Sequence, residues 1–339
     1  MRHTIVTRTA LLLGIGLLVV PHTRCETDSA VGDPWSMPAE IPTAADNPAS
    51  AERVELGRML FFDPRLSGSN SVSCANCHNP GLGWTDGLAR ARSSTGRPLQ
   101  RNTPTILNVA FASKLLWDGR ADSLEEQALM PIASPEEMDQ SLVEMIGELK
   151  GIAGYQAYFE RAFGEQGLNR TNVARALAAF QRTIVATESP FDRWRGGDDS
   201  ALSESAARGF DVFREKGRCT KCHDGFNFTD NGFHNIGVRQ PYGPDLGRFV
   251  VLPLANMRGA FKTPTLRDIA LTAPYMHNGI YATLEEVVEH YDRGGDVKVH
   301  LSEQIVPLNL TEGEKTDLVE FMRSLTGEPR PIVFPVLPR

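Results

Sequence analysis

The chain has 339 residues, of which 41% are hydrophobic and 23% are charged, so it is long enough to bury two ordinary hydrophobic cores. This composition excludes a disordered or a fibrous protein. The formal net charge is -7 at pH 7, which is the opposite of the basic footprint of nucleic-acid-binding proteins, and we expect no nucleic-acid partner.

Residues 1–25 have the features of a secretory signal peptide. Arg2 and Arg8 precede an apolar run, Ala10 to Val20, which is too short to span a bilayer. We therefore expect export into the periplasm of a Gram-negative bacterium, and no membrane span in the mature chain. Cys25 leaves a lipoprotein alternative open, although the residues before it are not the small ones typical of a lipidation site.

The next segment, residues 26–50, is rich in Pro, Ala and Asp without periodicity, and it predicts a linker or an arm lying on the surface. Helical periodicity dominates beyond it, so we predict a mostly α fold with two cytochrome c-like domains, each with one haem. The expected domains are residues 51–197 and 198–310, divided within a Gly-, Asp- and Ser-rich stretch. Residues 311–339 would form a C-terminal helix and tail closing the two-domain body.

Four Ser/Thr-x-x-Glu sequences predict capping boxes at helix starts. They are Ser123 with Glu126, Ser134 with Glu137, Thr283 with Glu286, and Thr311 with Glu314. There is also a weak internal repeat, in which a helical stretch with a glycine and aromatic residues, 55–62 and then 207–213, leads into a cysteine motif. The last helix, expected over residues 314–325, could close either domain.

Four of the five cysteines form two identical Cys-x-x-Cys-His motifs. The motifs consist of Cys74, Cys77 and His78, and of Cys219, Cys222 and His223. This spacing is typical of a c-type haem held by two thioethers, with the imidazole as an iron ligand. A redox disulfide or half of a zinc site also uses Cys-x-x-Cys, but neither needs the adjacent histidine. We therefore predict two covalently attached c-type haems.

The far side of each iron carries a sixth ligand or stays open, and this decides between electron transfer and chemistry. No histidine lies between residues 79 and 222. A first haem enclosed by the first domain must therefore use Met, Lys or Tyr, or remain open. Met130, Met138 and Met145 are candidates, but all three fall on patterned helices, where Met usually fills a core.

For the second haem, one stretch of sequence offers four candidates: Met276, His277, His290 and Tyr291. In the helix expected after Thr283, Tyr291 shares the apolar face with Leu284, Val287 and Val288. His290 points about 100° away from that face. Periodicity alone favours a core tyrosine over a ligand, and Met276, in a loop, would be the ordinary cytochrome ligand.

From about residue 51 to residue 331 the chain resembles the bacterial di-haem cytochrome c peroxidase family, and within it the MauG-like branch. Trp117 is similar to the family's inter-haem tryptophan, and Gln127, Pro131 and Glu137 follow at the spacings of its distal-pocket residues. Taken singly, Trp117 also fits a core aromatic, Gln127 a solvated helix residue, and Glu137 a member of a capping box. The resemblance implies that Glu137 moves protons, Gln127 orients peroxide, Pro131 limits the space and Trp117 connects the haems.

The resemblance also implies one structural Ca²⁺ between the domains. Asn102, Thr272 and Pro274 are similar to the positions that hold it in the family. The ion would be bound by hard oxygen ligands, mostly backbone carbonyls.

Three positions separate the chain from parts of the family. Where ordinary members carry a histidine that blocks the first iron, the chain has Ser94, which cannot ligate haem. Where ordinary members carry the methionine ligand of the second iron, the chain has Tyr291, as MauG-like members do. The resemblance therefore favours Tyr291 over Met276 as this ligand. His277 is also expected at the second haem. Where the MauG-like pattern has a tryptophan before the second motif, the chain has Gly217.

The resemblance therefore implies a peroxide-dependent di-haem oxidoreductase of MauG type. Hydrogen peroxide would react at an open five-coordinate haem in domain 51–197. A second haem with His223 and Tyr291 as ligands would store a hole, and the pair would form a high-valent di-iron oxidant for aromatic residues of a periplasmic partner protein.

Two alternatives stay open. The first is a di-haem cytochrome c peroxidase that reduces hydrogen peroxide with electrons from a small cytochrome c or cupredoxin. The second is a non-catalytic di-haem electron carrier or redox sensor, which would need a sixth ligand on both irons.

Overall fold

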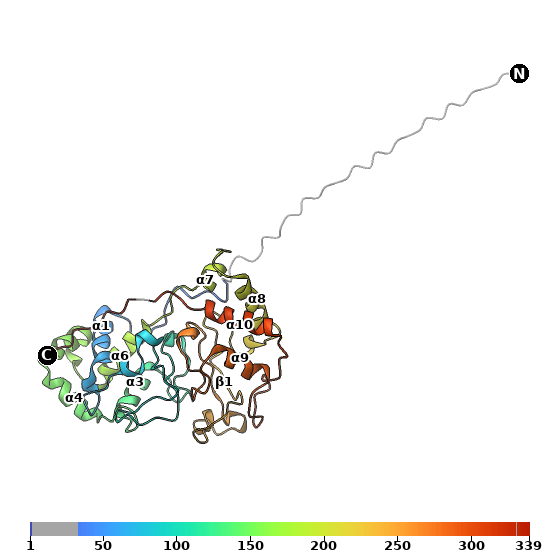
Figure 1. The fold of residues 1–339 in the computed structure, drawn as a ribbon. Helices are drawn as coiled ribbons and strands as arrows, with labels where there is room; N and C mark the ends of the chain where they lie inside the picture. Colours follow the sequence, from blue (N-terminus) through green and yellow to red (C-terminus); the bar gives the residue numbers. More distant parts are fainter. Residues whose placement is uncertain (2–32, 330) are drawn as a thin grey trace. The chain divides into compact units, whose positions relative to one another are not determined.

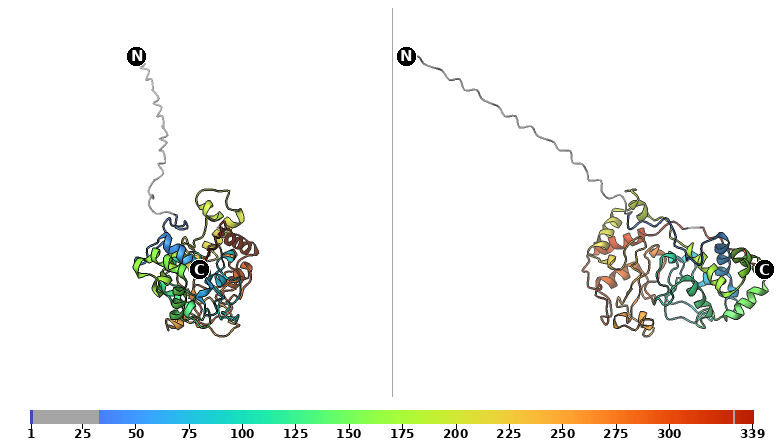
Figure 2. Two further views of the ribbon diagram at one scale, coloured as in Figure 1. Left: turned by 90° about the vertical axis from the view of Figure 1, so that its left-hand side faces the viewer. Right: turned by 180° about the vertical axis from the view of Figure 1, so that it is seen from behind.

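The computed structural model describes Met1, residues 33–329 and residues 331–339. The predicted signal peptide, with Cys25, and the start of the predicted arm lie outside the described residues. Residues 33–339 form one compact unit, drawn from three directions in Figures 1 and 2. Helices dominate it, as predicted, and the described part has one sheet, in which β1 (Phe233–His234) pairs antiparallel with β2 (Phe261–Lys262).

None of the helices within the described residues combines the length and the apolar character that crossing a bilayer requires.

The first half of the unit is built around α1 and α6 (Figure 1). Its helices are α1 (Ala51–Phe62), α2 (Cys74–Cys77), α3 (Leu124–Ala133), α4 (Leu142–Gly151), α5 (Ala153–Phe163) and α6 (Arg170–Arg182). Leu56 and Leu60 of α1 are buried with Leu177 of α6 in one hydrophobic core. Gly57 permits this approach, because a Cβ there would collide with the carbonyl oxygen of Ala176.

The second half repeats this arrangement with α8 and α10. Its helices are α7 (Pro190–Arg195), α8 (Glu204–Arg214), α9 (Leu284–Asp292) and α10 (Glu312–Ser324). Gly209 of α8 faces the backbone of Asp317 in α10 and leaves no room for a Cβ. Phe210 and Phe321 lie in the second core, so the last helix closes this half. The tail after it returns to the first half, where Gly154 N–H donates to the carbonyl oxygen of Arg339.

The domain boundaries at 197/198 and 310/311 stay predictions. A side chain from before the first boundary nevertheless packs in the core of the second half. Phe191 of α7 precedes that boundary and is fully buried in the second core. Trp35, from the predicted arm, is buried there as well, against Phe210 and Phe228. This end of the arm is therefore part of the core of the second half.

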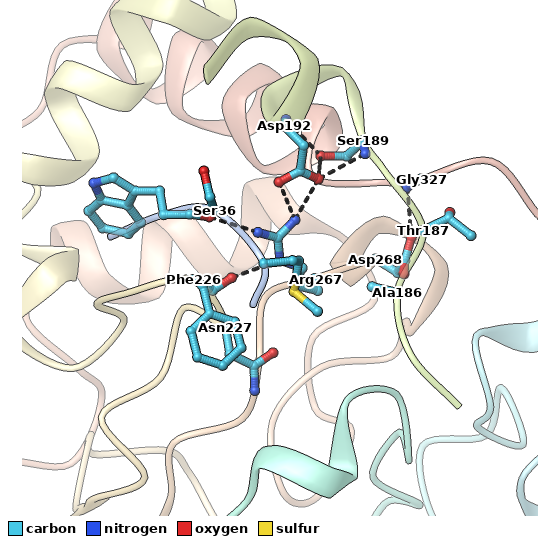
Figure 3. A network of polar contacts seen from close by, with 12 residues as sticks. Ser36, Ala186, Thr187, Ser189, Asp192, Phe226, Asn227, Arg267, Asp268 and Gly327 are labelled. Atoms are coloured by element: carbon cyan, nitrogen blue, oxygen red, sulfur yellow. Dashed lines mark hydrogen bonds and ion pairs between the residues drawn. The ribbon is translucent and has the colours of Figure 1, made fainter. Parts of the chain in front are cut away.

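A buried arginine joins these pieces (Figure 3). Arg267 is 1% exposed and forms an ion pair with Asp192 of α7 at 2.6 Å. It also donates hydrogen bonds to the carbonyl oxygens of Trp35 (3.0 Å) and Phe226 (2.8 Å). Because Phe226 lies in the loop after the second Cys-x-x-Cys-His motif, Arg267 fixes that loop to α7 and to the arm.

Three of the predicted helix starts are found. Thr283 and Thr311 form complete capping boxes at α9 and α10. Ser123 caps α3 by accepting the Glu126 N–H, while the Glu126 carboxylate accepts the N–H of Asp122, one residue earlier than predicted.

The predicted capping box of Ser134 and Glu137 is wrong. Helix α3 continues to Ala133, Ser134 is its C-cap, and Glu137 lies in the turn that follows. Asp139 then adopts a left-handed conformation with φ of 50°, which interrupts any helix begun before it. The next helix starts instead at Ser141, whose side chain accepts the Glu144 N–H. The carboxylate of Glu137 is therefore free of a capping role.

Residues 101–133 and 261–293 are two copies of one structural unit. Both contain Thr-Pro-Thr, and both reach Leu-Glu-Glu at the start of a helix, α3 or α9. The turn before each helix has matching positive φ angles, 68° at Leu116 and 73° at Met276. The correspondence pairs Asn102 with Lys262, Trp117 with His277, and Pro131 with Tyr291. It extends beyond the weak repeat noted in the sequence.

Candidate active site

Each Cys-x-x-Cys-His motif lines a cavity. The larger cavity, of about 450 Å³, is lined by Cys74, Cys77 and His78. The smaller cavity, of about 180 Å³, is lined by Cys219, Cys222 and His223. All four cysteines are free and half-buried. Two thiols and an imidazole in the wall of an otherwise largely apolar cavity are the donor set that a covalently bound haem requires.

Both motif histidines are oriented in the same way. His78 Nδ1 donates to the carbonyl oxygen of Trp84 at 3.1 Å, and His223 Nδ1 donates to that of Phe228 at 2.8 Å. In each motif the backbone N–H of the histidine also donates to the backbone carbonyl oxygen of the first cysteine, at 2.8 Å. A proton held on Nδ1 leaves Nε2 as the nitrogen available to a metal, as in most histidine metal sites.

The predicted distal residues meet at the larger cavity. Gln127 and Pro131 reach it from α3, and Glu137 reaches it from the turn after that helix. Burial raises the pKa of the Glu137 carboxyl; the positive charge of Arg120 opposes this rise and the neighbouring Glu136 adds to it. A carboxyl with a raised pKa in a cavity wall is suited to exchange protons near neutral pH.

The larger cavity contains few groups that could block an iron. His78 is the only histidine among the described residues that line it. The segment around Ser94 lies at its rim, because Ser94 N–H donates to the carbonyl oxygen of Glu137 at 2.9 Å. Of the three methionines considered as ligands, Met138 lines the cavity, whereas Met145 is fully buried in the first core and Met130 packs beside a separate apolar cluster.

Helix α9 supplies one wall of the smaller cavity. Leu284, Val287, Val288 and Tyr291 all line it, which is the face predicted from helical spacing. His290 is fully buried outside the cavity wall: its Nδ1 is hydrogen-bonded to the Tyr281 hydroxyl and its Nε2–H donates to the carbonyl oxygen of Ile236, each at 2.9 Å. Burial raises the pKa of Tyr291 far above its usual value, so the phenol is neutral at pH 7 unless a cation replaces its proton.

His277 and Met276 also reach the smaller cavity. His277 is 5% exposed, and its Nε2 is a buried atom without a hydrogen-bond partner among the described residues. The imidazole ring stacks on the ring of Phe261, with 3.6 Å between the ring centroids. Burial lowers the pKa of His277 to about 4. A buried nitrogen without a protein partner beside a cavity is free to bind a water molecule or a group held in that cavity.

Trp117 lies where the two cavities meet. It lines both, its ring centroid is 6.5 Å from that of His277, and its indole N–H donates to the carbonyl oxygen of Asn102 at 2.9 Å. Trp117 therefore lies between the two motif-lined cavities, and its role between two haems stays a prediction.

The three residues predicted at a calcium site also come together, since Asn102, Thr272 and Pro274 all line the larger cavity. Asn102 uses its side-chain N–H₂ for the carbonyl oxygen of Leu88, which leaves Oδ1 available. In the hydrogen bonds among described residues, the backbone carbonyls of Thr272 and Pro274 are not used. These are hard oxygen donors of the kind that calcium prefers.

Sequence reasoning missed several charged residues of the cavity walls, among them Arg120 and Lys262. Arg120 lines the larger cavity beside Glu137, and Lys262 lines both cavities. The correspondence between the two copies would have singled out Lys262, because it occupies the position of Asn102. Cys222, Asp230 and His234 form a cluster that could hold a metal ion, because their donor atoms lie within 4.8 Å of one another. Cys222, however, already belongs to a haem motif.

Comparisons with known proteins agree with this geometry. The family model for di-haem cytochrome c peroxidases matches residues 51–200. The methylamine utilization protein MauG of Methylorubrum extorquens is 49% identical over 89% of this chain and 86% of its own, and cytochrome c551 peroxidase of Nitrosomonas europaea is 37% identical over 88% and 86%. A solved MauG-like protein associated with microbial copper homeostasis superposes with a TM-score of 0.80, at 33% identity over 87% of this chain and 95% of that one.

Proposed function

The chain belongs to the di-haem cytochrome c peroxidase family, and from this premise we propose that it works in the manner of MauG, as a peroxide-dependent oxidant of a partner protein. Membership makes it an enzyme acting on peroxide, which removes the alternative of a non-catalytic carrier. It also implies two c-type haems. The residues present fit them, because each cavity presents two thiols and one oriented imidazole.

One observation carries the proposal: the two cavities differ at equivalent positions. Tyr291 on α9 presents a phenol to the smaller cavity, while the corresponding residue of α3 is Pro131, whose ring has no atom that can bind a metal. The haem at His78 would therefore be open on its far side, and the haem at His223 would have Tyr291 as its second ligand. An open iron beside an acid-base group favours chemistry over electron transfer alone.

When bound, the haems supply an iron that reacts with hydrogen peroxide and redox centres that take up its two oxidising equivalents. The residues of the larger cavity would do the proton work. Glu137, with its raised pKa, would take the proton from the oxygen nearer the iron and return it to the outer, departing oxygen. Gln127 would hold the peroxide in place by hydrogen bonds, and Pro131 would keep the space small.

Trp117 would connect the two sites, because it is in the wall of both cavities. In the smaller cavity, burial keeps the Tyr291 phenol neutral until a metal cation displaces its proton. An anionic oxygen ligand of this kind stabilises higher oxidation states of iron, whereas a thioether such as Met276 raises the potential and favours electron entry. Tyr291 as a ligand would therefore favour keeping an oxidising equivalent on the iron of the smaller cavity.

We also propose one Ca²⁺ at Asn102, Thr272 and Pro274, and export of the mature chain. Calcium would use the Asn102 Oδ1 and the two backbone carbonyls. It would stiffen the larger cavity, whose wall all three residues form.

The substrate is a partner protein whose aromatic residues are oxidised, but this chain lacks the tryptophan that the MauG-like pattern has before the second motif. At Gly217, the position of the pattern's tryptophan, a Cβ would lie 2.7 Å from the carbonyl oxygen of Val212. The local backbone therefore has no room for an aromatic side chain there.

A second candidate is a cytochrome c peroxidase fed by a small redox protein. Gly217, in place of the tryptophan of the MauG-like pattern, favours it, and the chain is also 37% identical to a cytochrome c551 peroxidase. The two candidates predict different turnover with peroxide and a reduced small c-type cytochrome as the sole donor. Slow turnover that Tyr291→Met accelerates would support the MauG-type proposal, whereas rapid turnover by the unaltered enzyme would favour the second candidate.

A further inference from the structure

Lys262 is the one charged side chain, among the described residues, that lines both cavities. It is carried by β2, next to Phe261 and the stacked His277. Its backbone N–H donates to the carbonyl oxygen of Trp117 at 2.8 Å. The strand thus holds the backbone of Lys262 beside Trp117, and its side chain lines the same two cavities as Trp117.

The ammonium has little to bind within the chain. Among the described residues its one hydrogen bond goes to the carbonyl oxygen of Thr263, at 3.2 Å, although an ammonium has three donors. No ion pair of Lys262 with a carboxylate is formed among the described residues. Burial lowers the pKa of Lys262 to about 8, and the carboxylate of Asp230 only partly offsets this. A desolvated cation with unused donors, in the wall of a cavity, is suited to an anionic ligand.

The position of Lys262 can be compared with its equivalent in the other copy of the structural unit. Lys262 corresponds to Asn102, and their backbones make equivalent bonds: Asn102 N–H donates to the carbonyl oxygen of His277 at 2.7 Å, as Lys262 N–H does to that of Trp117. Asn102 is the proposed calcium position. One copy would therefore recruit a cation from solution, and the other provides its own on a side chain.

We propose that the Lys262 ammonium is the built-in counterpart of the calcium ion, and that it binds a carboxylate of the haem cofactors where the two cavities meet. Haem carries propionate carboxylates, which supply the anion. A positive charge close to both irons favours the reduced state of each, because reduction adds an electron. Lys262 would thus act as a positioning residue that sets the reduction potentials of both haems together.

The inference rests on the two haems and not on the identity of the substrate, so its test uses neither peroxide nor a partner protein. The midpoint potentials of both haems are measured by anaerobic reductive titration of the holoprotein. Lys262→Met should lower both potentials and Lys262→Gln should do the same, although Gln can still donate to Thr263. Lys262→Arg should leave both near the wild-type values.

A matched control is Lys221→Met, because Lys221 is exposed and lines only the smaller cavity. It should move neither potential as far as Lys262→Met does. Haem content and thermal midpoint, measured on every variant, show that each protein has folded, and Lys262→Gln decides the matter if Lys262→Met does not assemble. Unchanged potentials in both neutral variants, or a change confined to one haem, would overturn the proposal.

Discussion

The indole N–H of Trp117 is hydrogen-bonded to the backbone carbonyl oxygen of Asn102, at 2.9 Å. This bond fixes the ring that separates the two cavities to a residue of the proposed calcium site. Trp117→Phe keeps an aromatic ring but removes the donor and part of the bridge between the haem positions. We expect both haems to attach with near-normal spectra, and an electron added by pulse reduction to distribute between them more slowly.

Trp194→Phe is the control for this experiment, because Trp194 packs against Phe191 and Phe210 and lines neither cavity. It should leave the distribution rate unchanged. Equal rates in Trp117→Phe and the wild type would remove Trp117 from the path between the haems. Removing calcium with a chelator should also slow the distribution if Asn102 is a ligand, because the ion and Trp117 share this residue.

Glu137→Gln tests the proton transfer. The amide fits the same place but cannot exchange a proton, so the rate constant for reaction with peroxide should fall by about 10²- to 10⁴-fold. Stopped-flow absorption of the oxidised holoprotein measures this constant. The adjacent exposed Glu136 provides the control, and at pH 8 Glu136→Gln should react at close to the wild-type rate. A fall of less than about threefold in Glu137→Gln would argue against an acid-base role for Glu137.

The pH profile of the same reaction has a predicted direction. Burial raises the pKa of Glu137, and its ionised form is the base, so the rate should increase with pH through a midpoint above the ordinary carboxyl value. Arg120 lowers this pKa and Glu136 raises it. Arg120→Gln should therefore move the midpoint to higher pH, and Glu136→Gln should move it to lower pH. Shifts in the same direction would contradict the assignment to Glu137.

Tyr291→Met and Met276→Leu together identify the second ligand of the smaller cavity. If Tyr291 binds the iron, Tyr291→Met changes the absorption and electron paramagnetic resonance spectra of the second haem, and Met276→Leu leaves them unaltered. Both side chains line the cavity, so a change in packing alone would affect the two variants alike. The reverse pattern would make Met276 the ligand.

Arg267→Leu should destabilise the fold strongly. It leaves the Asp192 carboxylate without its buried partner and removes the bonds to Trp35 and Phe226. We expect the free energy of unfolding to fall by about 3–5 kcal/mol, measured by urea denaturation of the holoprotein. The surface pair of Arg323 with Glu320 is the comparison, and Arg323→Leu should cost less than about 1 kcal/mol. Equal losses would mean that the buried network is not what holds the arm and α7.

Much of the candidate site could be predicted because covalent haem chemistry imposes a spacing that is visible in the sequence. The apolar face of α9 was predictable for a similar reason, since Leu284 and Tyr291 recur at helical intervals. The capping box at Ser134 failed because its pattern is local, while the left-handed turn at Asp139 that overrules it lies beyond the pattern.

Lys262 and Arg120 could not be found from haem-motif spacing or from helical periodicity. A lone lysine in a short strand carries no motif, and its importance comes from two cavities that meet only after the two halves pack. The correspondence of residues 101–133 with 261–293 was visible in principle, but the matching residues differ where function differs, as Pro131 does from Tyr291. Divergence at the functional positions hid the repeat.

The central claim is that the haem at His78 is open while the haem at His223 has both ligands. It is tested most directly by adding one equivalent of hydrogen peroxide to the fully oxidised holoprotein, with no reductant present, and recording the absorption spectrum by stopped flow. We predict an immediate spectral change at both haems. A spectrum that stays constant until the protein has first been reduced would contradict the claim.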